Sequence, residues 1–129
     1  MKSIIGVILI LFSCIVWAEN ELSAVEKQQR KLVSRFYEVL ELLPKSCPES
    51  AREEYEKSVI KFEKAYPEFI TLIRDSHFRL YAINNFSENT SPISQEACLF
   101  IKDTLDMEVS TEKGQKSMKN NTEVMRENG

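Results

Sequence analysis

Apolar residues recur at alternating spacings of three and four in the segment that follows residue 20, interrupted only by Gln29. They are Leu22, Val25, Leu32, Phe36, Val39 and Leu43. This spacing keeps one face of a helix apolar. Ser23 and Glu26 have the spacing of a capping box near its start, and Pro44 stands at its end. The pattern predicts a first helix from about residue 22 that ends at Pro44.

A second run of apolar positions also has helical spacing. It comprises Ala51, Tyr55, Val59, Phe62, Tyr66, Phe69, Ile73, His77 and Leu80. Ser46 and Glu49 form another capping-box pattern around Pro48, which is tolerated in a first turn. Pro67 disfavours helical geometry at the preceding residue and removes one backbone hydrogen bond. We expect either a break or a kink there, with helices near 48–65 and 67–84.

The last predicted helix follows the polar linker "NNFSENTSPIS", with Ser91 before Pro92 as its cap. Its expected buried face comprises Ile93, Ala97, Phe100, Ile101 and Leu105. From Ser110 onward Lys, Glu, Asn and Ser dominate, so residues 110–129 are predicted to form a disordered polar tail. The fold class is therefore all-α, a small antiparallel bundle of three to four helices over residues 19–109. No glycine occurs from residue 19 to residue 113, which disfavours hairpins and phosphate-binding loops.

The first 18 residues have the pattern of a secretory signal peptide. Lys2 precedes an apolar run over residues 4–12, and Ala18 supplies the small residue at the expected cleavage site. The short leader is typical of bacteria, so we expect cleavage after Ala18 and a periplasmic protein. Two alternatives remain open: an uncleaved anchor, and a lipoprotein acylated at Cys14, because residues 11–14 resemble a lipoprotein box.

Cleavage would leave two cysteines, Cys47 and Cys98. An even count in an exported protein predicts one disulfide. The alternative is a pair of free buried thiols.

Charge and composition narrow the classes of function. The net charge of −3 becomes one unit more negative when Lys2 is removed, which disfavours nucleic acid and an anionic membrane as partners. His77 is the only histidine, and no carboxylate stands three or four residues from it, so we expect no metal, no cofactor and no enzymatic activity. The spacing places His77 on the apolar stripe, as a packed or boundary residue. The acids around residues 49–63 interleave with lysines, as on a solvated helix face.

Two features of the first helix could serve binding. Lys27, Arg30, Lys31 and Arg35 form a basic set within an acidic chain, and like charges at i, i+4 repel. We predict a protein-binding site there. The apolar seam is also wider than a small bundle must bury, so a homodimer through this helix competes with ordinary core packing.

In signal peptide, size, helical content and a single Cys47–Cys98 pair, the chain resembles the small exported helical immunity proteins that protect bacteria from effectors delivered by type VI secretion. The resemblance implies a periplasmic inhibitor that binds a peptidoglycan-cleaving enzyme and blocks its cleft. Arg30, Lys31 and Arg35 are the side chains that we expect to contact the catalytic carboxylates of such a cleft. The alternative is an envelope chaperone that holds apolar segments of other proteins with Tyr55, Phe62, Tyr66 and Phe69.

Overall fold

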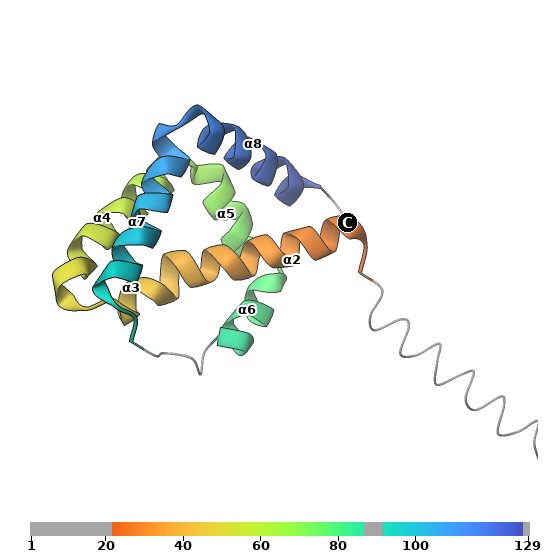
Figure 1. The fold of residues 1–129 in the computed structure, drawn as a ribbon. Coiled ribbons are helices and arrows are strands. Elements are labelled where there is room, and N and C mark those ends of the chain that lie inside the picture. The colour runs from red at the N-terminus through yellow and green to blue at the C-terminus, as the bar shows by residue number, and fades with distance from the viewer. Residues whose placement is uncertain (1–21, 87–91, 128–129) are drawn as a thin grey trace, which may run out of the picture.

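The computed structural model describes residues 22–86 and 92–127, and every regular element in those ranges is helical (Figure 1). The elements are α2 (Ala24–Tyr37), the π-helical η1 (Glu38–Leu42), α3 (Leu43–Ser46), α4 (Glu49–Ala65), α5 (Pro67–Asp75), α6 (Phe78–Phe86), α7 (Gln95–Ser110) and α8 (Glu112–Arg126). The all-α prediction is confirmed, although the helices are shorter and more numerous than the expected three to four. The predicted leader over residues 1–18, Cys14 and the Ser91 cap lie outside the described residues.

The first helix begins as the sequence indicates and ends differently. The Ser23 hydroxyl accepts from the Glu26 amide at 3.1 Å, and the Glu26 carboxylate accepts from the Ser23 amide at 3.3 Å, which confirms the capping box. Pro44 does not end the helix, because it lies in the first turn of α3. The intervening η1 is a π-helical turn in which the Leu43 amide donates to the carbonyl of Glu38, five residues earlier. This wider turn lets the chain continue through a proline that would disrupt a regular α-helix.

The second run of apolar positions breaks twice. Tyr66 separates α4 from α5 with φ −130° and ψ 58°, which confirms the break before Pro67. The expected helix over 67–84 is interrupted at Ser76, whose ψ of 139° is extended. The Ser76 hydroxyl accepts from the Phe78 amide at 3.2 Å. A serine side chain that bonds the nearby backbone competes with helix continuation, which explains the second break.

Two predicted helix starts are also shifted. α4 follows Pro48 with no side-chain cap, so the expected Ser46–Glu49 capping box is wrong. α7 is capped by Ser94, whose hydroxyl accepts from the Ala97 amide at 3.1 Å.

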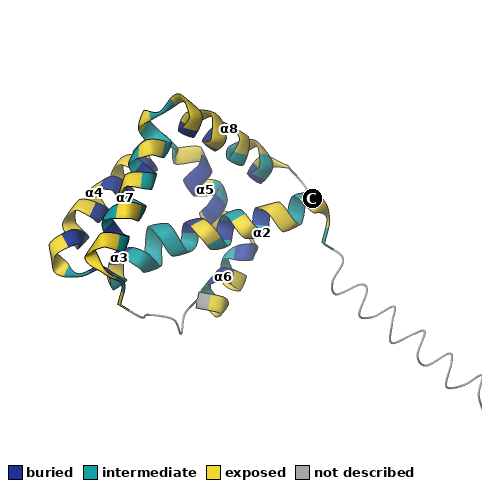
Figure 2. Cartoon of the chain, in the orientation of Figure 1, coloured by how far each residue is buried: buried dark blue, intermediate teal, exposed yellow. Residues whose placement is uncertain are grey.

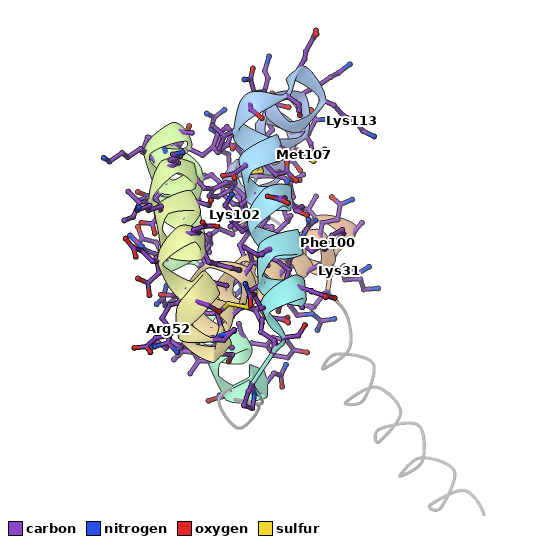
Figure 3. All side chains as sticks on the ribbon, turned by 60° about the vertical axis from the view of Figure 1, so that its left-hand side comes forward. Lys31, Arg52, Phe100, Lys102, Met107 and Lys113 are labelled. Atoms are coloured by element: carbon purple, nitrogen blue, oxygen red, sulfur yellow. A yellow bond between two sulfur atoms is a disulfide. The ribbon has the colours of Figure 1, made fainter. Side chains whose placement is uncertain are left out.

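Helices α4 and α7 lie side by side and run parallel (Figures 1 and 3). The buried disulfide Cys47–Cys98, with its Cα atoms 6.0 Å apart, joins the starts of both helices. At their far ends the Tyr66 hydroxyl donates to the Glu108 carbonyl. The predicted disulfide is confirmed, whereas the predicted antiparallel arrangement is wrong for this pair. α5 and α6 lie between α4 and α7 in the chain, and the disulfide places the start of α7 at the same end as the start of α4.

The core draws on α2, α4, α5, α6, α7 and α8, each of which contributes buried apolar residues (Figure 2), and its aromatic centre lies between α2, α4 and α5. The Phe36 ring stacks on Phe62 with centroids 5.5 Å apart and meets the edge of Phe69 at 4.8 Å. Buried Tyr55 donates its hydroxyl proton to the Val39 carbonyl of η1 at 2.6 Å. Burial raises the pKa of Tyr55, so the hydroxyl stays protonated and remains a donor.

The polar segment after residue 110 is helical rather than disordered over residues 112–126. The Thr111 hydroxyl accepts from the Gly114 amide at 3.0 Å, and Gly114, Met118 and Met125 are buried. At the other end of α8, the Gln29 side-chain amide donates to the carbonyls of Val124 and Glu127, at 2.9 and 2.7 Å. These contacts hold the end of α8 against α2, and α5 lies between the two helices (Figure 1).

Gly114 is expected to be essential for this arrangement. An added Cβ would lie 2.4 Å from the Met107 carbonyl oxygen and 2.6 Å from Glu108 Cα, both backbone atoms that cannot swing aside. In an uncrowded helix Gly→Ala is stabilising by about 1 kcal/mol. Here we expect Gly114→Ala to lower the free energy of unfolding by about 1–3 kcal/mol, in the range of overpacked sites. Urea denaturation of this variant, with exposed Ser117→Ala as the control, tests whether α8 is docked; a stabilising effect would contradict the docking.

Candidate interaction surface

The structure brings together three of the four predicted basic residues. Lys27, Lys31 and Arg35 are exposed on successive turns of α2, because residues four apart lie on one helix face. We call these three residues the basic strip. Arg30 points to another side, where its guanidinium lies 5.2 Å from the centre of the Tyr81 ring of α6. Arg30 therefore packs on α6 and is not part of the strip.

The cations of the basic strip differ in ion pairing from several other cations of this protein. Arg79 pairs with Glu41 at 2.9 Å, and Arg74 pairs with Glu63 at 3.1 Å. Among the described residues, no carboxylate forms an ion pair with a strip cation. The strip is thus a positive surface on an acidic chain, available to a negatively charged partner.

The basic strip ends beside an apolar hollow between α2 and α7. Arg35 lies over the Phe36 ring, 5.5 Å from its centre. The hollow measures about 190 Å³, and its lining comprises Arg35, Phe36, Val39, Phe100, Ile101, Thr104, Leu105 and Glu108. A positive charge therefore adjoins apolar surface at this end of α2.

The outer face of α7 carries two large exposed apolar side chains, Phe100 and Met107. They are 73% and 58% exposed, and Figure 3 shows both on the side of α7 that faces solvent. The prediction that Phe100 belongs to the buried face of this helix is wrong, and Met107 was not predicted. Their spacing of seven residues, two helical turns, is the sequence signal that could have revealed an exposed stripe.

A larger groove runs along this face to the start of α8. It measures about 530 Å³ and is lined by Phe100, Asp103, Thr104, Met107, Glu108, Thr111, Lys113, Gly114 and Ser117. The Asp103 carboxylate lies 3.6 Å from the Lys102 ammonium. Lys113 forms no ion pair with the described carboxylates. We call this feature the α7–α8 groove. Its shape comes from the tight approach of α8 to α7 at Gly114, which the sequence pattern did not indicate.

Glu108 lines both the hollow and the α7–α8 groove, as Phe100 and Thr104 do. Its buried Oε2 atom has no hydrogen-bond partner among the described residues. Burial raises the pKa of this carboxyl, and the positive charge of Arg35 opposes the rise. The folded protein therefore holds the Glu108 proton more tightly than the unfolded chain does.

This pKa shift predicts a pH dependence of stability. A raised folded-state pKa adds stability that is complete below the ordinary glutamate pKa and is lost as the pH rises through the folded value. Glu108→Gln keeps the shape without the titrating proton, so we expect it to be more stable than the wild type at neutral pH and to have a flatter pH profile. Denaturation midpoints from pH 4 to 8, with exposed Glu56→Gln as the control, test this. Parallel profiles for wild type and Glu108→Gln would contradict it.

Other residues selected from the sequence lie apart from this surface. His77 is exposed rather than packed in an apolar stripe, with its ring 4.1 Å from the Phe78 ring. Glu53 pairs with Lys57 on the exposed face of α4, at 3.4 Å. Within the described residues, no three His, Cys, Asp or Glu side chains come together as metal ligands.

The apolar sets suggested for a chaperone or a first-helix dimer are largely internal. Tyr55, Phe62 and Phe69 are buried, and Tyr66 is partly buried. Of the first-helix seam, Phe36 is buried, while the partly buried members pack against the core: Leu22, Leu32, Val39 and Leu43. The exposed apolar surface belongs instead to other helices, chiefly α7 and α6.

No protein-family model matches this chain, and neither a curated protein nor a solved structure is significantly similar to it. In the part of the chain that the structure describes, no helix has the length and apolar character needed to cross a membrane. The function is therefore inferred from the chain's own surface.

Proposed function

We propose that this protein is an exported, periplasmic inhibitor that binds another protein, and that its partner is a peptidoglycan-cleaving antibacterial effector. It would act as an immunity protein of the kind found beside type VI secretion effectors. The observation that carries the proposal is the basic strip, three cations without ion-pair partners among the described residues. Like charges one helical turn apart repel, and a negatively charged partner would relieve this repulsion.

The charge of the strip suits the cleft of a muramidase. Such clefts hold a pair of catalytic carboxylates, one of which is ionised. Lys31 and Arg35 lie on one exposed face of α2 and could approach these carboxylates together. Opposite charges raise the rate of association and fix the orientation of the two proteins, while the surrounding surface excludes the substrate. Inhibition in this scheme is steric, and no residue of this chain takes part in chemistry.

A photo-crosslinking experiment tests the partner class. A benzoylphenylalanine at position 31 is placed in the protein in the producing cell, and crosslinked species from the periplasm are identified by mass spectrometry. We expect a peptidoglycan hydrolase to be captured at position 31. Position 64, an exposed lysine on α4, is the matched control and should not capture it.

Two results would contradict the proposal: no hydrolase at position 31, or equal capture of the same protein at positions 31 and 64. A gene for a secreted hydrolase beside the gene for this chain would give an independent candidate for the same assay.

A further inference from the structure

The exposed face of α7 carries three side chains of different chemistry. Glu96, Phe100 and Met107 lie along one stripe, since Phe100 is four residues from the first and seven from the last. Two large exposed apolar side chains, Phe100 and Met107, flank Asp103 and Thr104 on this face, and exposed apolar surface gathered on one side of a small protein marks an interaction site. The order along α7 is an acid, an aromatic ring and a thioether, and Lys113 of α8 stands just beyond it at the edge of the α7–α8 groove.

We infer that a second copy of this chain covers this face, with the two α7 helices antiparallel about a twofold axis between Asp103 and Thr104. In this register each residue faces the one whose number sums with its own to 207. Phe100 of each copy then meets Met107 of the other and enters the α7–α8 groove, whose volume of about 530 Å³ has room for an aromatic ring. Contacts between a thioether and an aromatic ring are favourable. The twofold axis makes each of these contacts occur twice.

Charge complementarity supports the same register. Glu96 faces position 111 of the other copy, beside Lys113, which forms no ion pair with the described residues. Two intermolecular Glu96–Lys113 pairs would therefore flank the apolar centre. At the axis each Asp103 faces Thr104 of the other copy, and Lys102, which lies 3.6 Å from Asp103 and 3.1 Å from Asp106, balances part of its charge.

The other exposed apolar residues do not lie beside a groove together with a second exposed apolar residue two helical turns away. Ile60 is on α4, and Leu80 and Tyr81 are on α6. None of them lines the α7–α8 groove, and none has a second large exposed hydrophobic side chain seven residues away among the described residues. The inference does not depend on what the basic strip binds.

Sedimentation of the purified, oxidised protein over a range of concentrations tests the inference. We expect a concentration-dependent monomer–dimer equilibrium whose dissociation constant rises at least about tenfold in Phe100→Glu, a typical loss when a central apolar contact is replaced by a charge. Leu80→Glu makes the same kind of change at a residue that is 69% exposed on α6 and should dimerise as the wild type does.

A charge exchange tests the register. Glu96→Lys alone and Lys113→Glu alone should each weaken the dimer, and the double variant Glu96→Lys/Lys113→Glu should recover it. A wild type that is monomeric at every concentration would overturn the inference. A dimer that Phe100→Glu leaves intact, or one that Leu80→Glu disrupts instead, would overturn it equally.

Discussion

Replacing Phe62 by alanine is expected to lower the free energy of unfolding by about 3–5 kcal/mol, the range for a large aromatic side chain removed from a packed core. Phe62 is fully buried, at 0% exposure. Its ring centre lies 5.2 Å from that of Tyr66 and 6.4 Å from that of Phe69, in addition to its stacking on Phe36. The substitution removes the contacts of α4 with Phe36 of α2 and Phe69 of α5 and leaves a cavity that these helices cannot fully close.

The chain offers a control of the same residue type. Phe100 is 73% exposed, so Phe100→Ala at dilute protein concentration should change stability by no more than about 0.5 kcal/mol. Urea denaturation followed by circular dichroism measures both variants. Similar losses for the two substitutions would show that Phe62 is not part of a packed core.

Loss of the Cys47–Cys98 disulfide is expected to have an effect of similar size. The bond closes a loop with a sequence separation of 51 residues, for which the chain-entropy model gives about 4 kcal/mol at most. Because α4 and α7 also pack along their length and meet again through Tyr66 and Glu108, the reduced protein should remain helical. We therefore expect a lower denaturation midpoint with little change in the far-ultraviolet spectrum of the native state.

The measurement compares three samples: oxidised protein, reduced protein, and the variant Cys47→Ala/Cys98→Ala. The reduced protein and the variant should unfold at similar denaturant concentrations, and reductant should not affect the variant. An unchanged midpoint on reduction would contradict a stabilising role for the disulfide.

Features that depend on local chemistry were predicted from the sequence. The Ser23–Glu26 capping box and the break before Pro67 both follow from side chains and dihedral limits within a few residues. Once Cys14 was assigned to the leader, the even number of remaining cysteines was enough to predict the pair.

Features that depend on tertiary packing were not predicted. Pro44 was expected to end the first helix. Instead, η1 changes the backbone hydrogen-bond register before the proline. The Tyr55 hydroxyl of α4 also donates to the Val39 carbonyl of η1. α8 was missed because Met118 and Met125, seven residues apart, are too sparse a stripe to stand out in a polar sequence. The parallel arrangement of α4 and α7 was not predicted, because the length of the segment between them does not indicate at which end of the bundle α7 begins.

The candidate surface likewise combines features that local sequence predicts with features that depend on tertiary packing. The basic strip is a matter of charge and helical spacing, so Lys27, Lys31 and Arg35 were found from the sequence. The packing of Arg30 on Tyr81 was not predicted, because Tyr81 comes from a helix distant in the sequence. The α7–α8 groove depends on the change of chain direction at Thr111 and on the close approach of α8 to α7 at Gly114, so no local pattern could indicate it.

An inhibition assay with the hydrolase captured at position 31 tests whether the basic strip is the inhibitory surface. Clearing of a peptidoglycan suspension by that enzyme is followed with wild type, with Lys31→Glu/Arg35→Glu, and with the control Lys45→Glu/Lys64→Glu, which makes the same change in net charge at exposed lysines of α3 and α4. We predict that the wild type and the control inhibit the enzyme. The strip variant should inhibit it less at the same time after mixing, because loss of electrostatic attraction slows its association about tenfold. Equal inhibition by all three proteins would contradict a function that resides in the basic strip.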